Sequence, residues 1–141
     1  MDESVQSPET NTFALTVLRD RLLPDLLQED ESNILYWAGK DLAQREELSS
    51  ITAIELCFNR IGFGSLKAMS RQGTELKWEL SGPIVLARQA ERKTPSFYLE
   101  AGFLAQAIEA ISGTGVEAQV ETNERGVVFT VLAEQSLDLP I

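Results

Sequence analysis

The chain has 141 residues, of which 43% are hydrophobic and 24% are charged, and its formal net charge is −10. This composition is typical of one soluble globular domain that is long enough to bury its own core. The sequence contains no uninterrupted apolar run of the roughly 18 residues that a membrane-spanning helix requires. A chain this acidic should be repelled by nucleic acid. We therefore expect no transmembrane segment and no nucleic-acid partner.

The sequence contains no histidine and one cysteine, Cys57. These counts exclude histidine-based catalytic triads, histidine metal sites, zinc knuckles and iron–sulfur clusters. We therefore expect no metal and no cofactor. A lone cysteine cannot form an internal disulfide, and the acidic first residues lack the apolar core of a secretion signal, so the sequence predicts a cytoplasmic protein.

The two ends of the chain differ in character from its middle. Residues 1–10 are polar, contain Pro8 and show no periodicity, so we interpret them as a disordered lead-in. Residues 135–141 carry no helix or strand pattern, and we interpret them as a loose tail. Residues 11–134 contain no internal repeat and are predicted to form a single domain.

Three helices are predicted before the first strand. Pro24 lies near the end of the first helix or at a kink in it, and residues 28–31 form an acidic loop. Ser32 is expected to cap the second helix, and Ser49 or Ser50 to start the third, which a glycine-containing turn ends. These helices are expected at 11–26, 33–45 and 51–61.

The second predicted helix carries apolar or small residues on two of its sides. One small monomer can bury only one such side well, so we expect the N-terminal helices to form a homodimer. The residues concerned are Ile34, Leu35, Ala38 and Leu42 on one side and Tyr36, Gly39 and Ala43 on another.

The rest of the chain alternates between strand and helix patterns. Gln72-Gly73 predicts a hairpin turn, and residues 123–126 predict another. Residues 84–90 fit a strand or a short helix, and Pro83 favours the helix. This order predicts an α+β fold in which helices back an antiparallel, four-stranded sheet. The strands are expected at 66–71, 75–80, 116–121 and 127–132.

The most apolar stretch of the chain, 95–111, predicts a largely buried helix. Thr94-Pro95 supplies a start signal and Gly113 an end signal. At 100° per residue, Glu100 falls in the middle of the apolar face, where an unpaired carboxylate is costly. The Glu100 carboxylate can be paired in two ways: with a side-chain donor such as Lys40 or Tyr36, or with the free N–H groups of the first helical turn.

Six residues form the candidate site. A cleft between the second helix and the 95–111 helix can bind a small ligand, or support acid–base chemistry through Glu100, Lys40 and Tyr36. The structural alternative is an ordinary Lys40–Glu100 salt bridge. The candidate ligand-binding residues are Tyr36, Trp37, Lys40, Tyr98, Glu100 and Phe103.

Four separated motifs stand at residues 36–43, 62–66, 79–84 and 97–105. In the same order and with similar gaps, they resemble the YslB-like family of bacterial proteins. That family is in turn similar to four-vinyl-reductase-type domains and to Golgi transport-particle subunits. The resemblance implies the ligand-binding-domain fold known from nitric-oxide signalling and Golgi transport proteins, usually with dimer-forming helices.

Some members of these related families hold a hydrophobic ligand in the core, and distant ones bind haem. Four-vinyl-reductase-type domains often have cysteines where this chain has Ser96, residues 122–124 and Val128, and haem relatives need a histidine. The resemblance therefore implies the scaffold without a metal or thiol site. We expect a non-catalytic domain that binds a small apolar ligand or a protein partner. The alternatives are an enzyme and a purely structural adaptor.

Overall fold

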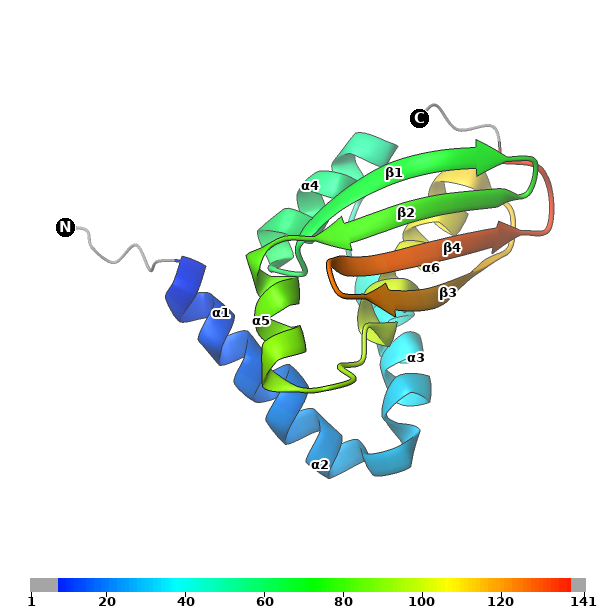
Figure 1. Ribbon diagram of the computed structural model, residues 1–141. Coiled ribbons are helices and arrows are strands. Elements are labelled where there is room, and N and C mark those ends of the chain that lie inside the picture. The colour runs from blue at the N-terminus through cyan, green and yellow to red at the C-terminus, as the bar shows by residue number, and fades with distance from the viewer. Residues whose placement is uncertain (1–7, 138–141) are drawn as a thin grey trace.

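The computed structural model describes residues 8–137, with side chains from Thr12 onward. Helices cover one face of a four-stranded antiparallel sheet, and no helix among these residues covers the opposite face (Figure 1). This arrangement confirms the expected α+β class. The strands are β1 (Ser65–Gln72), β2 (Glu75–Ser81), β3 (Val116–Asn123) and β4 (Gly126–Ala133), in the spatial order β1-β2-β4-β3.

The N-terminal helices form a long arm beside the sheet-bearing body (Figure 1). Its segments are α1 (Pro8–Val17), the π-helical turn η1 (Leu18–Leu22) and α2 (Leu23–Leu27), followed by the 3-10 turn η2 (Gln28–Asp30). The helix thus begins three residues before the expected Asn11. Residues 1–7 of the expected lead-in lie outside the described part.

The remaining helices match the sequence pattern closely. Ser50 caps the first turn of α4 by accepting a hydrogen bond from the Ala53 N–H, and Gly62 ends the helix at a φ of 97°. Ser32, by contrast, lies inside the first turn of its helix and does not cap it. The helices are α3 (Glu31–Gln44), α4 (Ile51–Ile61), α5 (Pro83–Glu91) and α6 (Tyr98–Ser112).

Two boundaries differ from the expectation. The helix α6 begins at Tyr98 rather than Pro95, because the Ser96 carbonyl accepts hydrogen bonds from Arg19 and Arg88. Glu31 opens α3 instead of lying in an acidic loop. Of the expected loose tail, residues 138–141 lie outside the described part, while Leu137 is buried and its N–H donates to the Gly73 carbonyl at 3.3 Å.

The core lies between the inner sheet face and α6. Alternate residues of β2 and β4 point into it, as the period of two in the strand pattern predicts. The rings of Phe58, Phe63 and Phe103 pack edge to face, with centroids 5.2–5.6 Å apart. The fully buried sheet residues are Leu76, Trp78, Leu80, Val127, Phe129 and Val131.

The helices α3 and α6 approach each other through two glycines. A Cβ on Gly102 would collide with the Tyr36 carbonyl oxygen, and one on Gly39 with the Leu99 carbonyl oxygen. Because these obstacles are backbone atoms, no side-chain rotation can relieve the collision. The glycines therefore fix the spacing of the two helices.

We expect Gly102→Ala to destabilise the fold by about 1–3 kcal/mol or more, because the two helices must separate. Denaturant unfolding measures the loss. The matched control is Gly115→Ala, whose new Cβ would meet the flexible Glu134 side chain. Equal, small losses for both variants would contradict the close helix contact.

Candidate functional site

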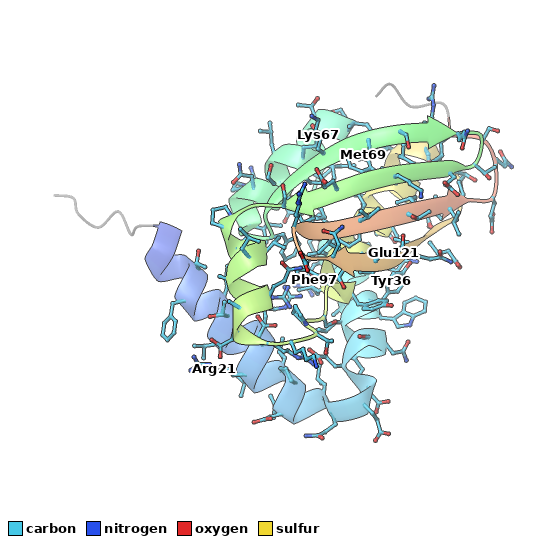
Figure 2. All side chains as sticks on the ribbon, in the orientation of Figure 1. Arg21, Tyr36, Lys67, Met69, Phe97 and Glu121 are labelled. Atoms are coloured by element: carbon cyan, nitrogen blue, oxygen red, sulfur yellow. The ribbon has the colours of Figure 1, made fainter. Side chains whose placement is uncertain are left out.

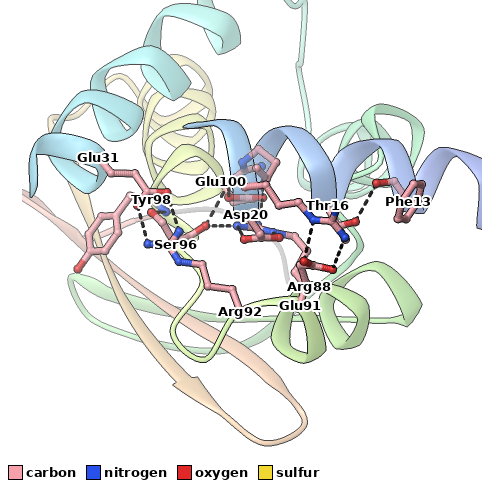
Figure 3. Close-up of polar contacts among 12 residues, drawn as sticks. Phe13, Thr16, Asp20, Glu31, Arg88, Glu91, Arg92, Ser96, Tyr98 and Glu100 are labelled. Carbon is pink, nitrogen blue, oxygen red and sulfur yellow. Dashed lines mark hydrogen bonds and ion pairs between the residues drawn. The ribbon is translucent and has the colours of Figure 1, made fainter. Parts of the chain in front are cut away.

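The carboxylate of Glu100 is the centre of a buried charge cluster (Figure 3). Only 1% of Glu100 is exposed. Its two oxygens each accept a hydrogen bond of 2.8 Å from the guanidinium of Arg19. Arg88 adds a third bond, from Nη1 to Oε2 at 3.2 Å. Glu100 thus accepts three hydrogen bonds from two charged groups, as a buried carboxylate requires.

A second carboxylate, Asp20, completes the cluster. Arg88 donates to it through two nitrogens, Nε to Oδ2 at 2.9 Å and Nη2 to Oδ1 at 3.1 Å. Both arginines also donate to the Ser96 carbonyl. The Arg88 guanidinium lies 4.4 Å from the centroid of the Phe97 ring. The cluster of Arg19, Asp20, Arg88 and Glu100 is therefore neutral, because two positive and two negative side chains meet in it.

The π-helical turn explains how one short segment supplies two members of the cluster. Arg19 and Asp20 are consecutive in sequence and both are buried. A π-turn is wider than an α-turn, so neighbouring side chains point in more similar directions. The turn lets both side chains enter the body, one toward α6 and the other toward α5.

The electrostatics of Glu100 reflect two opposing effects. Burial alone would raise the pKa of Glu100, but the Arg19 guanidinium, its hydrogen bonds and the nearby Arg88 together lower it. A lowered pKa means that the unfolded chain binds protons more readily than the folded one. The stability that Glu100 contributes is therefore fully present above its unfolded pKa and is lost as the pH falls through the folded value.

Two further ion pairs lie around the buried cluster. Arg92 binds Glu31 with two bonds of 2.8 Å, which joins the α5–α6 connection to the start of α3. Arg21 binds Glu91 at 2.8 Å, which joins the arm to the end of α5. Charged contacts therefore hold the N-terminal arm to the body on both its buried and its exposed sides.

The structure does not assemble the expected group of Glu100, Lys40 and Tyr36. Glu100 pairs with Arg19 and Arg88, so the expected Lys40 or Tyr36 partner was wrong. The Tyr36 hydroxyl accepts a hydrogen bond from the Ala118 N–H at 3.0 Å. Lys40 lies over the Tyr36 and Trp37 rings, 5.8 and 5.2 Å from their centroids. An acid–base site built from these three groups has no support in this geometry.

The other candidate residues separate into core and surface. Phe103 is fully buried in the aromatic core, and Trp37 is exposed. Tyr36 and Tyr98 lie together in a hollow of about 410 Å³ beside β3. A ligand-binding role for this pair stays a prediction. Ser32, Asn33, Glu117 and Ala118 also line the hollow, which we call the tyrosine hollow.

A larger hollow of about 720 Å³ lies between α1, the end of α4 and the start of α5. Leu15, Ile61 and Ile84 supply apolar walls, and Asn59 and Arg60 are polar groups at its lining. We call it the arm hollow. Among residues 8–137, no group of three or more histidine, cysteine or acidic side chains is placed to hold a metal ion. No helix in the same range is long and apolar enough to span a membrane.

Residues 12–132 match the model of a protein family of unknown function, DUF2507. The chain is also 37% identical to the uncharacterized protein YslB of Bacillus subtilis (strain 168) over 131 residues, which cover 92% of this chain and 88% of that protein. The chain belongs to the DUF2507 family. The expected resemblance is thereby confirmed.

Two solved structures share the fold of this family member at low sequence identity. The phenol-responsive sensory domain of the transcription activator PoxR, solved with phenol, is 14% identical with a TM-score of 0.57, covering 86% of this chain and 74% of that one. A vinyl-4-reductase family protein from Methanocaldococcus jannaschii is 20% identical with a TM-score of 0.54, and the match covers 94% of this chain and 83% of that one. At such identities the likeness establishes the fold alone.

Sequence reasoning found Glu100 but missed Arg19, Asp20 and Arg88. In the sequence, Arg19 and Asp20 look like ordinary surface charges of an amphipathic helix. The available signal was Glu100 itself, since a buried carboxylate needs a strong donor and arginine is the usual one. The fold determines which arginine pairs with Glu100, because Arg19 lies 81 residues away in sequence.

We expect Glu100→Ala to lower the free energy of unfolding by about 3–5 kcal/mol, because it leaves two buried arginines without their shared partner. Denaturant melts at low and high salt measure the loss, which should change little with salt because the pair is shielded from solvent. The control is Glu47→Ala, an exposed residue, with an expected loss within about 0.5 kcal/mol. Equal, small losses would show that the cluster does not stabilise the fold.

Proposed function

We propose that this chain is a non-catalytic binding domain that forms a homodimer through its N-terminal arm. One observation carries the proposal: the arm buries polar side chains against the body and exposes large apolar ones. Between Thr12 and Leu27 the fully buried side chains are Thr16, Arg19 and Asp20, all of them polar, and Leu15 packs against the core while only partly buried. A helix on the surface of a monomer normally turns its apolar face inward and its charges outward.

Four large apolar side chains of the arm are exposed. Phe13 is 60% exposed, Leu18 48%, Leu22 46% and Leu26 66%. Exposed apolar residues are ordinary when scattered singly, whereas a contiguous stripe marks an interaction surface. Leu18, Leu22 and Leu26 recur every four positions, so they run along one side of the arm for about 12 Å, whereas Phe13, five residues before Leu18, is rotated by about 140° from it. We call these three leucines the apolar stripe.

The stripe suits a second copy of the same chain. Its three leucines are spaced evenly, so two arms related by a two-fold axis can align antiparallel and bring leucine against leucine. Residues 12–27 contain two basic and two acidic side chains, whereas the whole chain carries −10. The arm is therefore a neutral region through which two acidic chains can approach with little repulsion.

A binding role also fits the chemistry of the charged groups. The Glu100 carboxylate is held by Arg19 and Arg88, and the Tyr36 hydroxyl is engaged by the Ala118 N–H. Groups fixed in this way support packing and orientation better than proton transfer to a substrate. A structural adaptor that docks a different protein on the same stripe is the alternative.

We expect Leu22→Glu to make the protein monomeric at micromolar concentration, because it places a carboxylate at the centre of the apolar stripe. Light scattering measures the mass. Leu56→Glu is the matched control, since Leu56 is 63% exposed on α4 and lies outside the arm. It should leave the dimer intact. A monomeric wild-type protein would overturn the proposed homodimer.

A second candidate function is the binding of a small apolar molecule in the arm hollow. The hollow's volume of about 720 Å³ falls within the range of small-molecule sites. Its walls include Leu15, Ile61 and Ile84. The phenol-responsive domain of PoxR is a protein of similar fold solved with a small aromatic molecule. The interior beneath the sheet is occupied by the Phe58, Phe63 and Phe103 rings, which favours the arm hollow as the site.

We expect an apolar molecule to co-purify with the wild-type protein and to be absent from Ala14→Phe, whose ring would fill the arm hollow. Native mass spectrometry of the purified protein detects it. Thr52→Phe, at an exposed α4 position that does not line the hollow, should retain it. Retention by Ala14→Phe would exclude the hollow as the binding site.

A further inference from the structure

The strand β3 is an edge of the sheet, paired on one side only, with β4. The register shows which of its backbone groups face outward. The Glu134 N–H donates to the Gly115 carbonyl, so positions 117, 119, 121 and 123 bond toward β4. The alternate residues Val116, Ala118, Val120 and Thr122 turn their N–H and C=O groups to the open edge.

Side chains cap the first half of this edge, and at its far end Gln89 donates a hydrogen bond to the Asn123 carbonyl at 2.8 Å. Glu109 accepts from the Val116 N–H at 3.4 Å, and the Tyr36 hydroxyl accepts from the Ala118 N–H at 3.0 Å. The outward N–H groups of Val120 and Thr122 have no such acceptor among the described residues. Two successive outward donors therefore remain available.

The opposite edge of the sheet is protected differently. On β1, the Glu55 carboxylate accepts from the Ala68 N–H at 3.3 Å, and the register shifts between Ala68 and Ser70. Bulges and charged caps are devices that keep an edge strand from pairing with another chain. The second half of β3 is a regular strand up to Asn123 and has no bulge. The two edges are therefore not equivalent.

Acidic and aromatic groups lie beside the open part of β3. The tyrosine hollow adjoins Ala118 and contains Tyr36, Tyr98 and Glu117. Tyr36 and Glu121 lie at the same edge of the molecule in Figure 2. Burial raises the pKa of Tyr36, and the carboxylates of Glu117 and Glu109 raise it further, against the lowering effect of the Ala118 N–H. The two carboxylates therefore make the hydroxyl side of the hollow electronegative, while the Lys40 ammonium lies over the Tyr36 ring.

We propose that an extended basic segment of a partner protein docks along β3 as an additional strand and places a lysine or arginine in the tyrosine hollow. Main-chain bonds to Val120 and Thr122 supply the strand pairing. Aromatic ring faces and a carboxylate attract an ammonium or guanidinium group. Lys40, which lies over the Tyr36 and Trp37 rings, is an example of the same attraction within this chain.

The charges along β3 determine the kind of segment that fits. Glu117 and Glu121 are exposed and four residues apart, which corresponds to about 13 Å along a strand. A paired strand presents its own alternate residues at the same period. A segment with basic residues at every second position therefore matches both carboxylates, whereas an acidic segment is repelled.

The test uses the full chain and a fluorescein-labelled hexapeptide of alternating lysine and valine, followed by fluorescence anisotropy. We expect the wild type to bind this peptide and Thr122→Pro to bind it at least tenfold more weakly. Proline removes the outward N–H of residue 122 and leaves the ladder to β4 intact, since edge strands tolerate it there. Thr122→Val keeps the N–H and should bind like the wild type.

Two further peptides separate the contribution of main-chain pairing from that of charge. A peptide with alternate N-methyl groups tests main-chain pairing without altering the protein, so the conclusion does not depend on the folding of Thr122→Pro. A peptide with glutamate in place of lysine should not bind. No binding of the lysine peptide to the wild type, undiminished binding of the N-methylated peptide, or equal affinity for the glutamate peptide would each overturn the proposal. Binding by Leu22→Glu should persist, because the arm and β3 are separate surfaces.

Discussion

The structure depends on the burial of two arginines and two carboxylates at the junction of the arm, α5 and α6. Removing four charges from water is expensive, and the cost is offset only when each charge is closely paired. Arg19, Asp20, Arg88 and Glu100 meet that condition through bidentate contacts and the Ser96 carbonyl. Loss of any one member leaves a buried opposite charge without a partner, so the four act as a single unit.

The contact between α3 and α6 links the helix that carries Glu100 to the edge of the sheet. Gly39 and Gly102 let the two helix backbones approach closely, and this places Tyr36 where its hydroxyl reaches the Ala118 N–H. The same helix thus fixes α6 on one side and caps part of the β3 edge on the other. Where Tyr36 no longer reaches, at Val120 and Thr122, the edge is open. The extent of helix packing therefore sets how much of the edge is protected.

Local patterns in the sequence predict most of the fold and little of its long-range pairing. The alternation of Leu76, Trp78 and Leu80 and the Ser50 and Gly62 caps are local signals, and the structure follows them. The burial of Glu100 was also predictable from helical periodicity. Its partners were not, because Lys40 and Arg19 are equally plausible donors until the arm is placed. The π-turn that buries Arg19 and Asp20 together is set by that placement, and helical periodicity gives no sign of it.

The chemistry of the cluster also explains why the arm turns its polar side inward. A helix with leucines on both faces could pack on the body in either of two orientations with similar burial. Charges at Arg19 and Asp20 remove that ambiguity, because only one orientation pairs them with Glu100 and Arg88. Buried polar groups are best known for specifying register in this way. The apolar stripe is then left facing outward, so the cluster that fixes the arm also presents the surface available to a partner.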